Sequence, residues 1–348
     1  RPELELVGRY RSGPSKFDVS TRVSWYLSER LRIGVAAGRA TRTNEGWIRP
    51  TWYNSLAHVV AGDDARDYHR SDRAAAELEW ISPEPPLWED APAWSFTLSG
   101  GWEEARSLKA RDVWVLFGES PFDACPDCAF MPTAVHEPEP NPAIDDGDLV
   151  FGRAGFTWSL RTREGRLSWG IGLEAGFDDG LGTAADDLDF LLAEGRISAR
   201  RVTSWGHAWD VFAIARFDLA GTLPRQRYST MGGVGTIPTM PLRGIRGPRL
   251  LYGEASYAVP LLGLPTLGGL DAFVRASAGG AWAEGAALRI EEALAGGLAA
   301  RLWDFQMEAG AAIGSAVPAG EIHVRAFFDV RVRRSARPAQ MPRRGRGF

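Results

Sequence analysis

The chain has 348 residues, of which 45% are hydrophobic and 24% charged, and this composition excludes an intrinsically disordered protein. Its formal net charge of −4 argues against nucleic acid as a general partner. No stretch reaches the roughly 18 consecutive apolar residues of a spanning helix, which argues against a helical membrane protein only. The 14 tryptophans are typical of a protein at a membrane interface, and the alternative is a soluble protein with a Trp-rich β-core. Arg1 opens the sequence without an initiator Met, which predicts a mature chain or an excised fragment.

Apolar and polar residues alternate with a period of two over segments of about ten residues, the length of a tilted membrane-spanning strand. The alternation is clearest at 17–27, 167–177, 211–219 and 322–332. The polar positions are rich in Gly, Ser and paired charges such as Arg325 with Asp329. Small and charged residues together suit the crowded interior of a barrel, whereas the wet face of a sandwich strand usually carries Lys, Thr and Ser. The pattern therefore favours an antiparallel β-barrel.

The same reasoning gives candidate strands along the whole chain: 3–11, 17–27, 30–42, 47–60, 74–82, 93–107, 112–117, 149–163, 166–177, 187–201, 205–219, 226–237, 249–260, 270–283, 287–301, 304–316 and 321–333. This is one more than a closed barrel of about sixteen strands needs, so we expect 112–117 or 47–60 to be partly loop, or a first strand upstream of Arg1. The predicted fold is an all-β transmembrane antiparallel barrel over residues 1–334. The Pro- and Arg-rich segment 335–348 is predicted to be a disordered basic tail.

The predicted connections differ in length, as is usual for the two rims of a membrane barrel. Short turns are expected at 28–29, 163–165, 303–304 and 318–320. Long loops are expected at 61–73, 83–92, 118–148 and 238–248.

The most distinctive motif is a Gly-rich entry, GGVG at 232–235, which leads into LRGI at 242–245. A strand carrying Glu254 follows and ends in Pro-Leu. This loop and strand resemble the signature of the BamA/TamA superfamily of outer-membrane β-barrels, also called bacterial surface antigens. In that family the loop precedes the last five strands, and five candidate strands follow it here.

The resemblance implies that the long loop folds back into the barrel and that Arg243, beside Gly244, contacts acidic residues on the inner wall. A guanidinium desolvated there needs carboxylate partners, because an unpaired buried charge is costly. The family usually carries Phe-x-Asp-x-Gly two strands later, but the matching stretch 273–277 reads Phe-Val-Arg-Ala-Ser. The remaining inward candidates for pairing with Arg243 are Glu254, Asp329 and Glu308. The alternative is an arginine exposed in a Gly-Pro loop.

Other motifs carry less chemistry. Cys125 and Cys128 form a CxxC pair, for which we expect a small disulfide in an oxidising envelope, with a redox pair or half a zinc site as alternatives. The acidic segment 62–71 could offer ligands to Ca²⁺, but it lacks EF-hand spacing and suits a solvated loop better. Adjacent Glu103 and Glu104 point to opposite faces of a strand, so they make a poor acid/base pair. No nucleophile, phosphate-loop or HExxH motif occurs, and we expect no enzymatic activity, metal or cofactor.

The resemblance implies a barrel in the outer membrane of a Gram-negative-type bacterium that takes part in protein insertion, assembly or translocation. Its partners would be outer-membrane lipids, client outer-membrane proteins and periplasmic partner domains, which would lie upstream of Arg1 or on other chains. In the family the first and last strands pair weakly and client strands add to the exposed edge. Three alternatives stay open: the membrane anchor of an upstream hydrolase domain, a structural or passive barrel in a larger envelope assembly, and a soluble β-sandwich or lipocalin-like protein.

Overall fold

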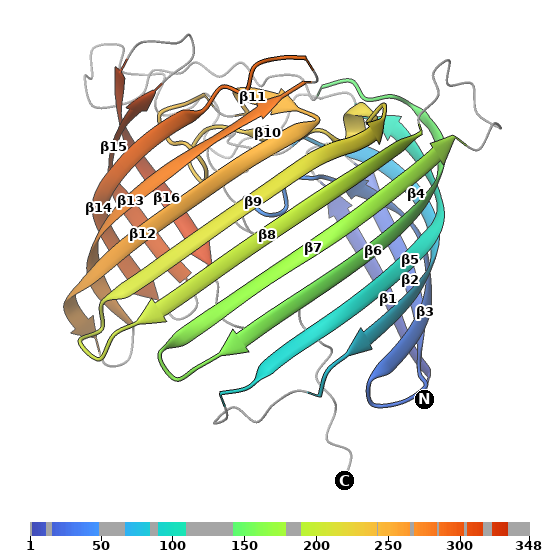
Figure 1. The fold of residues 1–348 in the computed structure, drawn as a ribbon, viewed down its shortest axis with the longest axis horizontal. Helices are drawn as coiled ribbons and strands as arrows, with labels where there is room; N and C mark the ends of the chain where they lie inside the picture. The colour runs from blue at the N-terminus through green and yellow to red at the C-terminus, as the bar shows by residue number, and fades with distance from the viewer. Residues whose placement is uncertain are drawn as a thin grey trace.

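The computed structural model describes residues 2–11, 16–48, 67–83, 90–108, 142–178, 189–241, 243–264, 268–283, 285–302, 305–315 and 322–332. Fourteen strands form one antiparallel sheet in chain order, and two short strands form a separate pair. The sheet strands are β1 (Pro2–Arg11), β2 (Lys16–Tyr26), β3 (Leu31–Arg42), β4 (His69–Ile81), β5 (Pro92–Ser107), β6 (Gly147–Arg161), β7 (Gly165–Asp178), β8 (Phe190–Val202), β9 (Ala208–Gly221), β12 (Arg249–Leu264), β13 (Gly268–Trp282), β14 (Glu291–Leu302), β15 (Phe305–Ser315) and β16 (Ile322–Val332). The short pair is β10 (Ser229–Met231) with β11 (Ile245–Gly247), and a 3₁₀ helix, η1 (Arg225–Arg227), precedes it. Figure 1 shows the large sheet curled into a barrel.

The period-two alternation becomes two chemically different faces of this sheet. On β7, Ile171, Leu173 and Phe177 are exposed on the outside, whereas Glu174 on the alternate face is engaged inside. The outer positions of neighbouring strands are likewise exposed large apolar side chains, and aromatic pairs such as Trp158 with Trp169 add to them. An apolar outer surface of this kind faces lipid, because water would not favour so many exposed Leu, Ile and Phe side chains. The predicted barrel alternation is therefore confirmed.

The two rims differ in their connections. The rim at which β1 begins carries short connections at 27–30, 162–164 and 203–207 and, at 82–91, a connection of ten residues, where a long loop was predicted. The strand ends at the opposite rim are separated by longer stretches of sequence, 43–68, 108–146 and 222–248. This is the predicted asymmetry of a membrane barrel. Among the residues that the structure describes, no helix is long and apolar enough to cross a membrane.

One predicted strand, 226–237, differs from the observed elements, and two others lie wholly or mostly outside the described residues. The segment 226–237 is not a spanning strand but contains η1, the three-residue β10 and a turn, because Gly232, Gly233 and Gly235 have φ of 128°, 76° and 106° and bend the backbone. The described part of 47–60, residues 47–48, lies in a turn, and the rest of that segment lies outside the described residues, as does 112–117. Five strands, β12 to β16, follow the loop as predicted.

The first and last strands mark a seam. β1 pairs with β2, and β16 pairs with β15. Within the described ranges no ladder joins β1 to β16, so each presents one unpaired edge. An unpaired strand edge is a template for pairing with another chain. The outward face of β1 is strongly exposed at Leu4, Leu6 and Tyr10.

Candidate functional site in the barrel lumen

The connection between β9 and β12, residues 222–248, lies inside the barrel, and we call it the inner loop. Met231, Ile237 and Met240 of this loop are fully buried. They form one apolar cluster with inward side chains of the wall, namely Phe212, Ile214, Leu250, Tyr252 and Ala293. Burying three large apolar side chains against this apolar part of the inner wall stabilises the folded-back position of the loop. The inner loop is therefore a packed part of the lumen.

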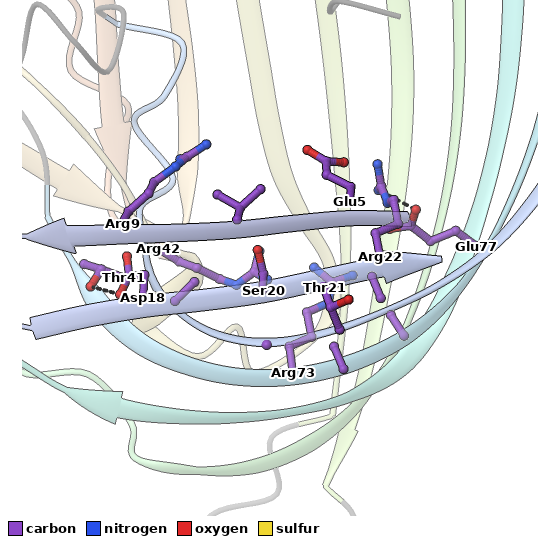
Figure 2. A pocket seen from close by; sticks show the side chains of 16 residues that line it. Glu5, Arg9, Asp18, Ser20, Thr21, Arg22, Thr41, Arg42, Arg73 and Glu77 are labelled. Carbon is purple, nitrogen blue, oxygen red and sulfur yellow. Dashed lines mark hydrogen bonds and ion pairs between the residues drawn. The ribbon is translucent and has the colours of Figure 1, made fainter. Parts of the chain in front are cut away.

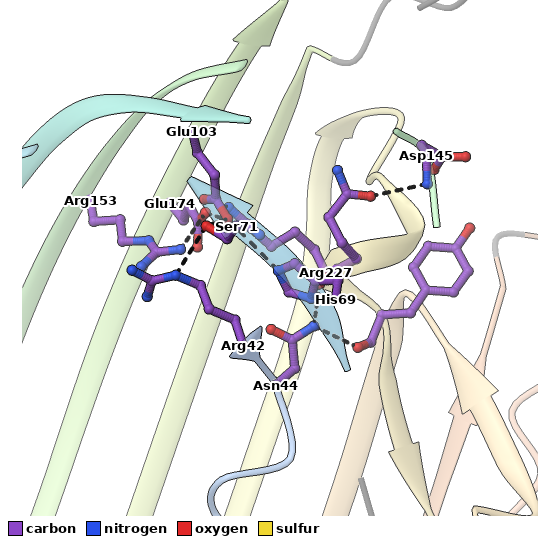
Figure 3. Close-up of polar contacts among 11 residues, drawn as sticks. Arg42, Asn44, His69, Ser71, Glu103, Asp145, Arg153, Glu174 and Arg227 are labelled. Carbon is purple, nitrogen blue, oxygen red and sulfur yellow. Dashed lines mark hydrogen bonds and ion pairs between the residues drawn. The ribbon is translucent and has the colours of Figure 1, made fainter. Parts of the chain in front are cut away.

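Arg227 of η1 is the electrostatic centre of this loop. Its Nη2 donates to Glu103 Oε2 at 2.6 Å, and its Nε donates to Glu174 Oε1 at 2.8 Å. The Arg227 and Glu103 side chains are only 3% and 0% exposed, so both charges are desolvated. Burial lowers the pKa of the Arg227 guanidinium, but Glu174 and Glu103 outweigh it and raise the pKa above its ordinary value. Figure 3 shows this cation between carboxylates from β5 and β7.

The two carboxylates are held by the wall as well as by the loop. Ser71 Oγ donates to Glu103 at 2.8 Å, and His69 Nε2 lies 3.7 Å from the same carboxylate. Arg153 donates to Glu174 at 2.8 Å. A buried ion pair is favourable only when further hydrogen bonds serve its charged groups, and Ser71 and Arg153 supply such bonds to the two carboxylates. The cluster thus ties the inner loop to β4, β5, β6 and β7.

Two side chains next to strand ends, Asn44 after β3 and Asp145 before β6, hold the backbone of η1. Asn44 Nδ2 donates to the carbonyl oxygens of Gln226 and Tyr228 at 2.6 and 2.9 Å. Asp145 accepts from the Arg225 backbone N–H and from its Nε at 2.7 and 2.9 Å. The backbone groups around a short 3₁₀ turn have few internal partners, so the Asn44 amide binds two of its carbonyls and the Asp145 carboxylate binds one of its N–H groups. The segment that follows β3 and the segment that precedes β6 therefore both bind η1.

Comparisons with known structures agree with the barrel fold. The chain matches CdiB from Escherichia coli (13% identity, TM-score 0.55) over 91% of its own length and 53% of that chain. It matches CdiB from Acinetobacter baumannii (10%, 0.51) over 94% and 53%, and BamA from Haemophilus ducreyi lacking POTRA domains 1–3 (11%, 0.54) over 95% and 64%. The chain thus spans between about half and two thirds of those proteins. No family model and no curated protein sequence matches it.

The chain has the fold of the BamA/TamA-type outer-membrane β-barrels. At these identities the likeness establishes the fold alone. In this chain itself the inner loop precedes the last five strands, as predicted. The contacts of the polar lumen residues in this chain show how its inner loop is held.

In this BamA/TamA-type fold Arg243, the arginine of the LRGI motif, lies near the first residue of β4. Arg243 has a φ of 54°, and its Nη1 donates to Asp67 at 3.1 Å. Arg246 lies 3.5 Å from the same carboxylate. Gly244 follows, and a Cβ there would lie 3.1 Å from the Pro241 carbonyl oxygen, so the position is tight. Leu242 lies outside the described residues.

The three acids predicted to pair with Arg243 lie on the inner face of the last five strands. Glu254 on β12 accepts from the Tyr252 hydroxyl at 2.9 Å. Glu308 on β15 and Asp329 on β16 stand opposite each other in the sheet and are buried. Glu308 forms an ion pair with Arg275, the arginine that replaces the expected Asp. Pairing of Arg243 with any of these three acids stays a prediction, while its observed ion pair is with Asp67.

The last strand also holds the inner loop. Arg325, on the inner face of β16, donates to the Met240 carbonyl oxygen at 3.0 Å and to that of Pro238 at 3.4 Å. Val234 of the loop packs against the cluster that contains Phe273 and Phe327. The loop thus connects the last strands to the opposite wall, where Arg227 is bound.

The remaining sequence-predicted sites lie elsewhere. Cys125 and Cys128 are outside the described residues, so the disulfide stays a prediction. Among the residues that the structure describes, no group of three His, Cys, Asp or Glu side chains could hold a metal ion. Glu103 faces inward and Glu104 outward to Arg106, which agrees with their predicted opposite faces. Sequence reasoning missed the Arg227 cluster, for which the only signal was a charged residue in a strand-like segment.

Proposed function

We propose that this chain is an outer-membrane barrel through which, or beside which, polypeptides are inserted into or moved across the outer membrane. The observation that carries the proposal is the unpaired edge of β1 beside a polar hollow. The hollow, of about 420 Å³, is lined by the inner faces of β1 to β4, and Glu5 and Arg9 of β1 border it (Figure 2). An extended segment in this hollow would be next to a free strand edge.

The inner loop supports the same function. Its apolar side chains pack on the side of the lumen formed by β9 and β12 to β16, against Phe212, Tyr252 and Phe273, while its Arg227 reaches across to β5 and β7. The hollow lies on the other side, along the first strands. A polypeptide entering there would meet polar side chains and backbone edges, which suit an unfolded chain better than an apolar pocket would. The partners that fit are outer-membrane lipids outside and client polypeptides, with periplasmic domains delivering them.

The proposal is tested in two steps, of which the first identifies the process. The gene is depleted in its own host, and the outer-membrane and secreted proteins are quantified. Loss of other β-barrels from the membrane would identify insertion, and loss of secreted polypeptides would identify export. If neither class changes, the chain is a passive barrel or an anchor and the proposal is wrong.

The second step is a prediction about the seam. In a background with Cys125 and Cys128 replaced by Ser, a cysteine at Leu6 of β1 is combined in turn with cysteines along the outer face of β16. We expect the pair that cross-links under oxidation to abolish complementation of the depleted strain, and a reductant to restore it, because a closed seam offers no strand edge. The control is a cysteine pair at Leu173 and Ala193, which lie directly opposite each other on β7 and β8. Activity with a locked seam would contradict the lateral route.

A further inference from the structure

Many arginines of the barrel wall form ion pairs with carboxylates on neighbouring or nearby strands. Cross-strand or near-neighbour ion pairs join Arg22 to Glu77, Arg32 to Glu79, Arg153 to Glu174, Arg249 to Asp218, Arg275 to Glu308 and Arg301 to Asp271. This is the expected arrangement, because a guanidinium removed from bulk water needs a carboxylate partner. An inward arginine without such a partner therefore requires another explanation.

Arg42 and Arg73, on adjacent strands β3 and β4, have no carboxylate partner among the described residues. Arg42 Nε donates only to the neutral Ser71 hydroxyl, at 3.1 Å. The Arg73 guanidinium lies over the Phe151 ring, 4.0 Å from its centroid. Arg73 is also repelled by Arg153, Arg42 and Arg227 and attracted by Glu103, so positive charge is in excess among the groups that act on it. A cation–π contact orients a guanidinium but does not neutralise it.

Both arginines line the hollow along β1 to β4, as Figure 2 shows. Two of the three acids that border this hollow are engaged by other cations. Glu77 is bound by Arg22, and Asp18 accepts from Arg70 at 2.8 Å. Glu5 is the third acid and belongs to the seam strand β1. The part of the hollow at Arg42 and Arg73 therefore has donors and positive charge to offer a ligand.

We propose that Arg42 and Arg73 form an oxyanion-binding site that holds carboxylate side chains of a polypeptide in the hollow. The inference rests on the proposed function and names the chemistry of the client segment: acidic and extended. Guanidinium groups bind carboxylates with paired, charge-assisted hydrogen bonds, and Phe151 presents Arg73 in a fixed position for this. The hollow has room for side chains of a passing segment but not for a folded domain.

Binding of a fluorescent peptide of alternating Glu and Ser to the full chain in detergent micelles tests the site. We expect Arg42→Gln/Arg73→Gln to weaken binding about tenfold or more, because two charge-assisted contacts are lost. The matched control is Arg32→Gln, which removes one inner-wall charge at a pair outside the hollow and should leave the affinity within about twofold. A peptide of alternating Lys and Ser should not bind. Resistance of the barrel to SDS at room temperature confirms that each variant is folded.

The outcomes separate the two proposals. Equal weakening by Arg32→Gln and by the double substitution would mean general electrostatic attraction and would overturn the site. Inorganic phosphate that displaces the acidic peptide at equal concentrations would assign the arginines to phosphate groups and overturn the polypeptide ligand. The binding assay does not depend on export or insertion in cells, so it can fail while the depletion experiment succeeds, and the reverse also holds.

Discussion

Arg227→Gln is expected to release the inner loop from the wall and to destabilise its folded-back position by about 3–5 kcal/mol. The substitution leaves Glu103 and Glu174 without the cation that joins them, and both carboxylates are buried or nearly so. An uncompensated buried charge costs more than the pair itself contributes, so the loss is large. The release is measured as increased single-channel conductance in planar bilayers and as new protease cleavage within residues 222–248.

Two matched variants test this account of Arg227. Arg225→Gln alters the same 3₁₀ turn, but Arg225 is 53% exposed in its pair with Asp145, so its loss is expected to cost less than about 1 kcal/mol. The double variant Arg227→Gln/Glu103→Gln removes both charges of the most buried pair and leaves Glu174 paired with Arg153, so it should recover much of the wild-type conductance. Equal effects of Arg225→Gln and Arg227→Gln would contradict a lock centred on Arg227.

The fold could be predicted because its main signal is local. Residues i and i+2 of a strand face the same side whatever their partners are, so Ile171, Leu173 and Phe177 predict a lipid face without knowledge of neighbouring strands. The five strands after the LRGI loop were predictable for the same reason. The prediction of a strand at 226–237 was wrong because the alternation there resembles that of a strand, whereas its glycines adopt positive φ and bend the chain.

The Arg227 cluster could not be predicted because its contacts are distant in sequence. Glu103 is 124 residues from Arg227, and Glu174 is 53 residues from it. A single strand pattern identifies which face a carboxylate occupies, but not which element of a folded-back loop reaches it. The pairing depends on the sheet closing around η1, which is a property of the whole fold.

Arg275 reverses the charge that the family pattern predicts at this position, and it still forms an ion pair. The family pattern predicts an acid at this inward position, and the chain has an arginine. The structure places it against Glu308 of β15, with Asp329 directly across on β16. Arg275 and Glu308 thus form an ion pair across the inner wall, and Arg243 of the loop forms an ion pair with Asp67 before β4. The contact of the loop arginine could not be derived from the motif because the acid that it meets lies outside it.

Glu45 is expected to make the packing of the inner loop dependent on pH. Its side chain is 1% exposed, accepts from Thr43 Oγ1 at 2.6 Å and accepts from the Thr230 backbone N–H of the loop at 3.3 Å. Burial, together with the charge of Asp67, raises the pKa of the Glu45 carboxyl to about 7. Between the ordinary value near 4.5 and about 7, the folded state holds a proton that the unfolded state has lost. Stability therefore falls as pH rises through this window and is constant above it, for a total of roughly 3 kcal/mol.

Urea unfolding in detergent micelles at pH 5 and pH 8 measures this effect. We expect the wild-type midpoint to be lower at pH 8, and Glu45→Gln to remove most of the difference, because the amide stays neutral while keeping an oxygen acceptor for the Thr230 N–H. The control is Glu164→Gln, which alters a carboxylate exposed in its pair with Arg201 and should keep the wild-type pH dependence. Since Glu45 bonds the backbone of β10 while Arg227 binds the wall two residues before it, deprotonation of Glu45 would weaken the loop next to its strongest ion pair. A pH dependence that Glu45→Gln leaves unchanged would assign it to another buried group.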